Sequence, residues 1–217
     1  MIELLYFNNK NKFQDEEFDH ILFLLPEQER VKILKYKQWK DQQARAIGRF
    51  LVMDLLRRKN ISGKKIENLS YTEYGKPFFE GVDFNFNISH SGDYVVCACG
   101  TNVKVGVDIE EMKDINFEDF DSILTKEEKY SLYISKNKKA LFYKIWCTKE
   151  AALKADGRGL SVPLNQINLI QEKVTINNVI YHTQKININP AYELIVASSN
   201  KDYDVSVHEF NLQNYLD

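Results

Sequence analysis

The sequence predicts an α+β protein built from two similar halves, each a small, mostly antiparallel sheet packed against one long helix. Two segments, 42–58 and 141–155, carry apolar residues at helical spacing. Each is followed by short runs rich in β-branched and aromatic residues, which favour strands. Two of these runs, 94–98 and 193–197, also have similar hydropathy profiles. We therefore expect one theme, a long helix followed by strands, to occur twice.

Local sequence signals predict the first strand, one hairpin turn and the other strands. Residues 2–7 are predicted to form the first strand, because the segment is short, has the acidic Glu3 near its start and lacks the basic start and cleavage site of a signal peptide. The asparagines at 177 and 178 lie between two β-branched runs and predict a hairpin turn. The other strands are predicted at 84–88, 94–99, 103–109, 174–176, 179–181, 192–197 and 205–209.

Composition narrows the class of protein. A chain of 217 residues with 44% apolar content can bury one large core or two small ones. The net charge of −2 argues against non-specific nucleic-acid binding, which needs a broad basic surface. No apolar run approaches the roughly 20 residues that a membrane span requires. We expect a soluble, cytoplasmic protein, and we expect Cys97 and Cys99 to be apolar packing residues instead of a zinc or redox pair.

Two carboxylates on one predicted strand suggest a cation site. Asp108 and Glu110 stand at positions i and i+2, so they point to the same face while Val107 and Ile109 pack into the core. At about 4 Å and an effective dielectric of about 20, two like charges repel by roughly 4 kcal/mol. Such a pair favours either open water or a shared hard cation.

A third carboxylate and a lysine lie on the second long helix. Trp146, Glu150 and Lys154 are spaced i, i+4 and i+8, so they share one ridge. Taken alone, these residues also fit an ordinary explanation. Asp108 and Glu110 could be the wet face of a half-buried strand, and Glu150 with Lys154 is a common helix surface pair that stabilises by only about 0.2–0.5 kcal/mol.

The order and content of three sequence blocks decide between these explanations. Residues 86–91 (FNISHS), 105–110 (VGVDIE) and 146–154 (WCTKEAALK) resemble the three signature blocks of the 4′-phosphopantetheinyl transferase superfamily, of the type that activates surfactin synthetase. The resemblance covers residues 74–161, and a weaker likeness extends through 26–56. It implies two subdomains related by pseudo-twofold symmetry and a single chain that works as a monomer.

The resemblance implies a reaction and a division of labour between the halves. Residues 1–104 would contact the nucleotide end of coenzyme A, residues 105–217 would carry the metal and catalytic residues, and the active site would lie in the cleft between them. The implied reaction transfers the phosphopantetheine arm of coenzyme A to a serine hydroxyl of an apo carrier protein and releases adenosine 3′,5′-bisphosphate. The implied enzyme is a holo-[carrier protein] synthase.

The resemblance also implies residue roles. Asp108, Glu110 and Glu150 would hold Mg²⁺, with Mn²⁺ as a second candidate, because hard cations prefer oxygen ligands and substrate phosphates. Glu150 would accept the serine proton, either directly or through a water molecule held by the metal. Lys154 would stabilise or protonate the leaving phosphate, and Trp146 would support Glu150. The residues expected to be catalytic are Asp108, Glu150 and Lys154; those expected to bind the coenzyme are Arg45, Lys76, Pro77, Ser89, His90, Lys149 and Lys154.

Some of these assignments have an ordinary alternative. His90 is expected at a loop-to-strand junction, where histidine commonly caps or packs, and the turn around Lys76 could be a plain surface turn. Arg45 is the best candidate for a phosphate contact because its guanidinium is planar and bidentate. Many relatives have a second basic residue beside it, where this chain has Ala44. The basic residues that precede it, which could solvate a helix face instead, are Arg30, Lys32 and Lys35.

Partners follow from the same resemblance. Carrier proteins of this pathway present an acidic helix, so a basic and partly apolar docking surface is needed, and the resemblance puts it within 117–139, including Lys138 and Lys139. The carrier could belong to a peptide synthetase, a polyketide synthase, a fatty acid synthase or a lysine-pathway enzyme. Two rival functions are a non-catalytic module that binds coenzyme A or a carrier protein, and a metal-dependent hydrolase or nucleotidyl transferase.

Overall fold

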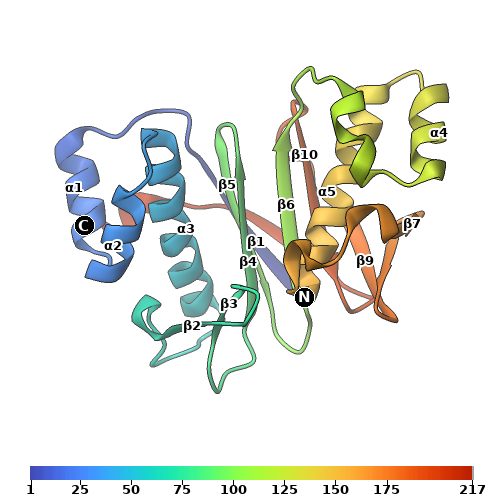
Figure 1. Ribbon diagram of the computed structural model, residues 1–217. Coiled ribbons are helices and arrows are strands. Elements are labelled where there is room, and N and C mark those ends of the chain that lie inside the picture. Colours follow the sequence, from blue (N-terminus) through green and yellow to red (C-terminus); the bar gives the residue numbers. More distant parts are fainter. Residues whose placement is uncertain (217) are drawn as a thin grey trace.

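The two expected halves are present, each with a sheet and a long helix (Figure 1). A computed structural model describes residues 1–216, apart from the side chain of Leu160; Asp217, the end of the expected second half, lies outside this range. The first sheet has the order β11-β1-β5-β4 and the second has the order β6-β10-β9-β8-β7. The α+β prediction is confirmed.

The first half contains most of the N-terminal elements. The long helix α3 (Trp39–Arg58) begins three residues before the predicted start and packs against the first sheet. The other elements of this half are β1 (Ile2–Asn8), α1 (Asp15–Phe23), α2 (Glu27–Leu34), the hairpin of β2 (Leu69–Tyr71) and β3 (Pro77–Phe79), β4 (Asn85–Ser91) and β5 (Tyr94–Gly100).

The second half repeats the plan. Its long helix α5 (Lys138–Asp156) packs against β6 (Val105–Glu111) and β10 (Tyr192–Ser198). Asn177 and Asn178, with φ values of 47° and 64°, form the predicted hairpin turn between two strands. The remaining elements are α4 (Lys126–Ile134), β7 (Asn168–Ile170), β8 (Lys173–Ile176) and β9 (Val179–Lys185).

Strand pairing shows how closely the halves correspond. In the first half, the strand before the long helix, β1, pairs with β5, which pairs with β4. In the second half, β6 likewise pairs with β10, which pairs with β9. All four pairings are antiparallel. The segments 94–98 and 193–197, whose profiles are alike, lie on the equivalent central strands β5 and β10.

One strand departs from this division. The last strand, β11 (Val205–Glu209), lies beside β1 and runs parallel to it, with Ile2 opposite Val205 and Tyr6 opposite Glu209. The short helical turn at Leu212–Tyr215 then packs on the first core. The segment expected as the second half, 105–217, therefore ends in residues that complete the first sheet.

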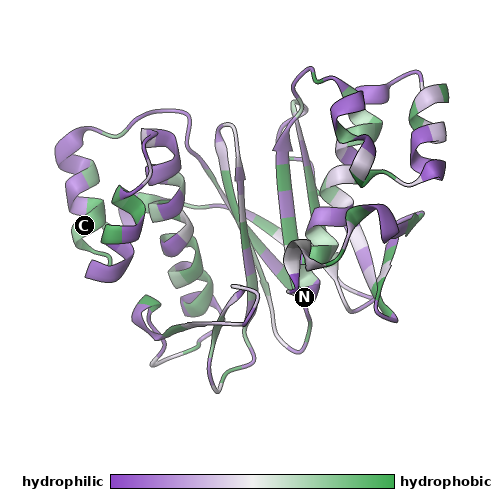
Figure 2. Cartoon of the chain, viewed as in Figure 1, coloured by the Kyte–Doolittle hydropathy of each residue, from purple (hydrophilic) through white to green (hydrophobic). Residues whose placement is uncertain are grey.

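The two sheets share an apolar interface. Leu4, Val96, Val107, Ile109 and Val196 belong to one buried cluster that draws on strands of both sheets. Figure 2 shows hydrophobic residues on these central strands and on α3. Since Val107 and Ile109 pack into this cluster, Asp108 and Glu110 must face the other way, as their spacing predicted. Within residues 1–216, no helix is both long and apolar enough to cross a bilayer.

Candidate active site

The two halves meet where β4 and β6, an edge strand from each sheet, lie next to each other. Polar side chains on β4 accept hydrogen bonds from the backbone of β6: Asn87 Oδ1 from Val107 N (3.0 Å) and Ser91 Oγ from Glu111 N (3.1 Å). Ser89 Oγ is 3.4 Å from Ile109 N. These side chains take the place of a neighbouring strand.

This ladder explains part of the first sequence block. Asn87, Ser89 and Ser91 alternate along β4 and therefore share one face. Sequence reasoning considered only Ser89 and missed the other two residues, although the period-two polar pattern was visible. His90 was expected at a loop-to-strand junction, and this was wrong: it lies inside β4, because the pairing with β5 continues to Ser91 opposite Tyr94.

The second block brings β6 against α5. Gly106 is required for this close approach, because a Cβ atom there would lie 2.0 Å from Ala151 O and 2.4 Å from Ala155 N. Any side chain would push the strand and the helix apart. The glycine therefore allows the carboxylates of β6 to approach the polar ridge of α5.

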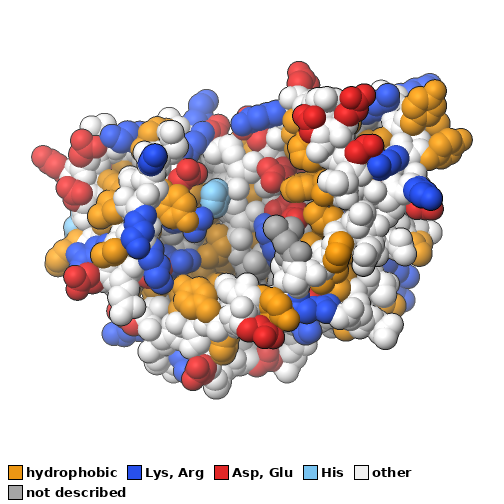
Figure 3. All heavy atoms as spheres, in the orientation of Figure 1, with side chains coloured by type: hydrophobic (Ala, Val, Ile, Leu, Met, Phe, Trp, Pro, Cys, Tyr) orange, Lys and Arg blue, Asp and Glu red, His pale blue; other side chains and the backbone are white. Residues whose placement is uncertain are grey.

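A hollow of about 240 Å³ lies at this junction. Figure 3 shows the surface hollowed between the halves, with blue basic side chains gathered on the first half and red acidic ones facing them. The structure brings together here most of the residues that the sequence singled out. The hollow is lined by Ile88, Ser89, His90, Asp108, Glu110, Trp146, Glu150 and Lys154.

A hydrogen-bonded group forms the floor of the hollow. Asp108 is buried, and its Oδ1 accepts from Lys154 Nζ (2.5 Å) and from Ser89 Oγ (3.0 Å). Lys154 Nζ also donates to Ser89 Oγ (3.0 Å). The partner of Lys154 is thus a carboxylate of β6 and not Glu150 on its own helix. The lysine charge offsets part of the cost of burying Asp108.

The other two carboxylates bind protons more tightly than usual. Burial raises the pKa of Glu150, and the nearby charges of Asp108 and Glu110 add to this while Lys154 opposes it. Burial also raises the pKa of Glu110, although Ser91 Oγ donates to it at 2.7 Å and lowers the pKa in part. Burial is the main cause of both shifts, and the like charges nearby add to it.

The fit of these carboxylates to a metal ion can be tested on the donor atoms. No three His, Cys, Asp or Glu side chains in the described part of the chain already surround one point. However, Asp108 Oδ2 is buried and accepts no hydrogen bond from any residue in 1–216. An unpartnered oxygen and two carboxylates of raised pKa suit a hard divalent cation whose remaining ligands come from elsewhere. The residues fit such an ion, with the shell left incomplete by the protein.

A second, basic hollow of about 420 Å³ lies on the first half. Lys32 and Arg49 both donate to Glu29, and although burial opposes its ionisation, these bonds lower the pKa of Glu29. Arg45 stacks on the ring of Tyr36, with Cζ 4.0 Å from the centroid. Its buried Nε donates to no group within residues 1–216. Because Glu29 is the one acidic residue of the described chain that lines this hollow, against four basic residues, the hollow has an excess of positive charge.

His90 connects the two hollows electrostatically. Partial burial of its imidazole lowers the pKa of His90, and the positive charges of Arg45 and Lys154 lower it further, with Asp41 opposing them. The ring thus lies within the field of cations from both hollows. An anion that spanned them would reverse this effect and favour the protonated ring.

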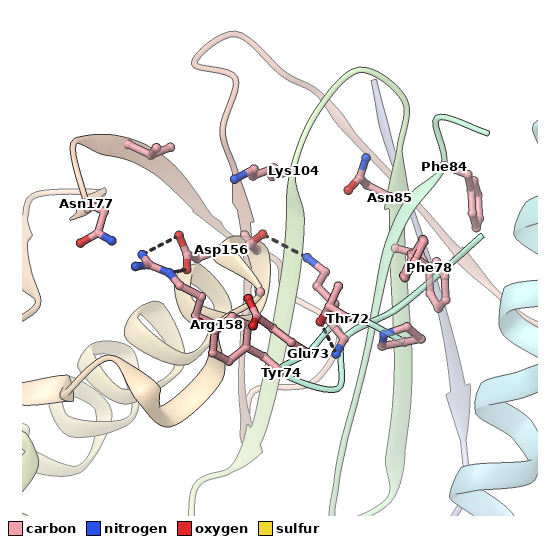
Figure 4. A pocket seen from close by; sticks show the side chains of 16 residues that line it. Thr72, Glu73, Tyr74, Phe78, Phe84, Asn85, Lys104, Asp156, Arg158 and Asn177 are labelled. Atoms are coloured by element: carbon pink, nitrogen blue, oxygen red, sulfur yellow. Dashed lines mark hydrogen bonds and ion pairs between the residues drawn. The ribbon is translucent and has the colours of Figure 1, made fainter. Parts of the chain in front are cut away.

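Three more expected coenzyme contacts lie outside the hollow between β6 and α5. Lys149 is only 2% exposed, and its Nζ donates to Glu128 Oε2 (2.6 Å) and Leu164 O (2.9 Å). Adjacent helical residues point about 100° apart, so Lys149 cannot share the ridge of Glu150. Lys76 and Pro77 line a third hollow of about 750 Å³ at the foot of α5 (Figure 4), and Lys76 Nζ donates to carbonyls of that helix.

Trp146 supports the site through packing. Its indole stacks on Phe142, with ring centroids 6.3 Å apart, and meets the edge of Phe120. A hydrogen bond from Trp146 lowers the pKa of Glu110 in part. This effect is on Glu110, and the expected support of Glu150 by Trp146 stays a prediction.

The fold and this site are typical of an enzyme that acts on a phosphorylated substrate: acidic residues and a lysine line one hollow, and a cationic hollow lies next to it. A family model described as the 4′-phosphopantetheinyl transferase superfamily matches residues 104–207, and one described as the N-terminal part of 4′-phosphopantetheinyl transferase matches 12–102. The chain belongs to the 4′-phosphopantetheinyl transferase superfamily and is a transferase.

Individual relatives cover nearly the whole chain. The 4′-phosphopantetheinyl transferase Sfp of Bacillus subtilis is 32% identical over 94% of each chain. A second protein of that organism, the 4′-phosphopantetheinyl transferase ffp, is 30% identical over 87% of this chain and 88% of its own. The 4′-phosphopantetheinyl transferase gsp of Aneurinibacillus migulanus is 31% identical over 89% of this chain and 81% of its own.

Proposed function

We propose that this protein transfers the phosphopantetheine arm of coenzyme A to a serine hydroxyl of an apo carrier protein. The observation that carries the proposal is the group formed by Asp108, Lys154 and Ser89, which faces Glu150 across one hollow. Membership of the superfamily supports it. All residues of both hollows come from one chain, so we propose that a monomer is active. We also propose that it acts in the cytoplasm.

The reaction forms one bond and breaks one. The serine oxygen attacks the phosphorus that carries the pantetheine arm, and the bond from that phosphorus to the oxygen of the adenosine 5′-phosphate breaks. Glu150 accepts the serine proton, a role for which its raised pKa suits it near neutral pH. Lys154 stabilises the leaving phosphate, which departs as adenosine 3′,5′-bisphosphate.

Asp108, Glu110 and Glu150 would hold Mg²⁺, or Mn²⁺ as a second candidate, which would neutralise charge on the phosphates. Ser89 and His90 face the same hollow and are proposed to contact the coenzyme phosphates. The nucleotide end would then lie along the β2–β3 hairpin, where Pro77 lies. Lys149 is not proposed as a coenzyme contact, because its ammonium is buried in the pair with Glu128.

The direct test is the intact mass of an apo peptidyl carrier and an apo acyl carrier after incubation with this protein, coenzyme A and Mg²⁺. We expect a mass gain of one phosphopantetheine that requires the metal, and the preferred carrier shows which pathway is served. If coenzyme A binds but neither carrier gains mass, the protein is a non-catalytic binding module. If simple nucleotides lose phosphate instead, it is a hydrolase.

The spare charge of the basic hollow suggests that Arg45 binds the 3′-phosphate of coenzyme A. Replacing Arg45 by glutamine is expected to raise the KM for coenzyme A about 10- to 100-fold, as a lost charge-assisted hydrogen bond of about 1.5–3 kcal/mol would. The KM for 3′-dephospho-coenzyme A should change little. Arg57→Gln, on the exposed end of the same helix, is the matched control. Equal losses for both coenzymes would contradict the assignment.

Helix α4 has the character of a docking surface for an acidic carrier. Tyr130, Tyr133 and Ile134 are exposed on it, and Lys138 Nζ lies 5.9 Å from the centroid of the Tyr133 ring. Charge reversal of Lys138 and Lys139 is expected to lower kcat/KM for the carrier roughly tenfold. The KM for coenzyme A should be unchanged. The control is charge reversal of the exposed Lys173 and Lys201. If the Lys138/Lys139 variant and this control variant have the same kcat/KM for the carrier, docking at α4 is excluded.

A further inference from the structure

The turn between β2 and β3 holds Lys76 in a defined position. Gly75 N donates to Thr72 O (2.9 Å), Thr72 N donates to Lys76 O (2.9 Å) and Lys76 N donates to Thr72 Oγ1 (3.1 Å). Gly75 has a φ of +81°, which glycine adopts without strain. The start of the Lys76 side chain is therefore fixed on the first half of the molecule.

The other end of that side chain is fixed on the second half. Lys76 Nζ donates to Lys154 O (2.7 Å), Ala155 O (3.0 Å) and Val105 O (3.4 Å). An ammonium has three hydrogens to donate, so its capacity is filled. Gly157 leaves room for the stem, because a Cβ atom there would meet Lys76 Cδ at 3.0 Å. The lysine thus crosses the cleft and ends against α5.

These acceptors are backbone groups of the elements that carry the reactive residues. The last carbonyls of a helix lack partners within the helix and carry partial negative charge, so a cation there stabilises the final turn. Val105 begins β6, the strand of Asp108 and Glu110, and Lys154 accepts at its own carbonyl. One ammonium therefore ties the end of α5 and the start of β6 to the first half.

The Lys76 ammonium is largely buried, and this changes its pKa. Burial lowers the pKa of Lys76 to about 8, with the charge of Lys104 adding to the shift and Asp156 opposing it. In Figure 4 Lys104, Asp156 and Arg158 surround the same hollow. Arg158 is paired with Asp156. Because the ammonium has so little water, its hydrogen bonds to the three carbonyls offset part of the cost of burying its charge.

We propose that Lys76 is a positioning residue for the transfer reaction: it caps α5 and so holds Lys154 and Glu150 at their places opposite the first half. Its side chain does this without touching the coenzyme. The activity readout rests on the proposed function, whereas a second readout, hydrogen exchange, does not.

The kinetic test compares Lys76→Met with Lys104→Met, an exposed lysine of the same hollow. For Lys76→Met we expect kcat to fall about 10- to 100-fold, since small displacements of catalytic groups have effects of this order. The KM for coenzyme A should change less than about twofold. Lys104→Met should leave both values near wild type. A raised KM with unchanged kcat would make Lys76 a coenzyme contact and overturn the proposal.

The structural test measures amide hydrogen exchange across α5. In Lys76→Met, exchange at 153–157 should speed up, including the Gly157 amide that donates to Leu153 O at 2.9 Å. Exchange earlier in the helix should not change. Unaltered exchange at 153–157 would reject the capping role even if the wild type transferred nothing. If Lys76→Met does not fold, Lys76→Gln, which keeps two donor hydrogens, carries both tests with smaller effects in the same direction.

Discussion

Replacement of Glu150 by glutamine is expected to lower kcat for phosphopantetheine transfer by about 10²- to 10⁴-fold, the usual contribution of a general base. The amide keeps the size of the side chain but cannot take a proton. The proper measurement is the initial rate of mass gain on a carrier at saturating coenzyme A and Mg²⁺. Binding of coenzyme A, measured by calorimetry, should be nearly unchanged, because the basic hollow around Arg45 is intact.

A matched control separates this effect from the loss of any surface carboxylate. Glu16→Gln removes an exposed carboxylate on α1, away from the proposed docking surface, and should leave the rate near wild type. If the rate of Glu150→Gln returned to normal at high Mg²⁺, the residue would serve to hold the cation and not to accept the proton. A rate within about threefold of wild type at every Mg²⁺ concentration would remove Glu150 from the chemistry altogether.

Replacement of Lys149 by methionine is expected to destabilise the fold by about 3–5 kcal/mol, the cost of leaving a buried charge unpaired. Its partner Glu128 is buried and also caps α4, where Thr125 N donates to Glu128 Oε2 at 2.8 Å. The variant would leave that carboxylate facing Leu164 O without a cation. Urea denaturation gives the free energy of unfolding directly.

The double variant Lys149→Met/Glu128→Gln tests the cause. Removing both charges should recover more than half of the lost free energy, because the unpaired charge and not the missing packing is the main penalty. A loss below about 1 kcal/mol in the single variant would show that water reaches Glu128 and that the pair is not truly buried.

The sequence predicted which side chains share the hollow at β6 and α5, because these residues lie on regular elements, while their catalytic roles stay predictions. Period two on β6 and the ridge of α5 gave the directions of Asp108, Glu110, Glu150 and Lys154. The pairing of Lys154 with Asp108 was not predicted, because it depends on how β6 lies against α5. Glycine at 106 permits that approach, but only the packed structure shows which atoms it brings together.

Other parts depended on contacts that sequence patterns do not record. Lys149 follows a motif residue, but one step along a helix turns it into the core, where Glu128 from α4 meets it. The helices α1, α2 and α4 were not predicted, because 8 or 9 residues give too little helical periodicity. The pair of three-residue strands β2 and β3 is defined by its own turn and by the packing of β3 against β4.

The position of β11 has a consequence for how the molecule unfolds. The second half is covalently flanked by β5 before it and β11 after it, and both are strands of the first sheet. Opening the second half therefore pulls on the register between β1 and β11, so we expect one cooperative transition for the whole chain. A polypeptide cut between 104 and 105 would leave the first piece without a strand and with the long edge of β1 bare, which favours self-association. The two halves resemble each other, but we expect that neither folds independently.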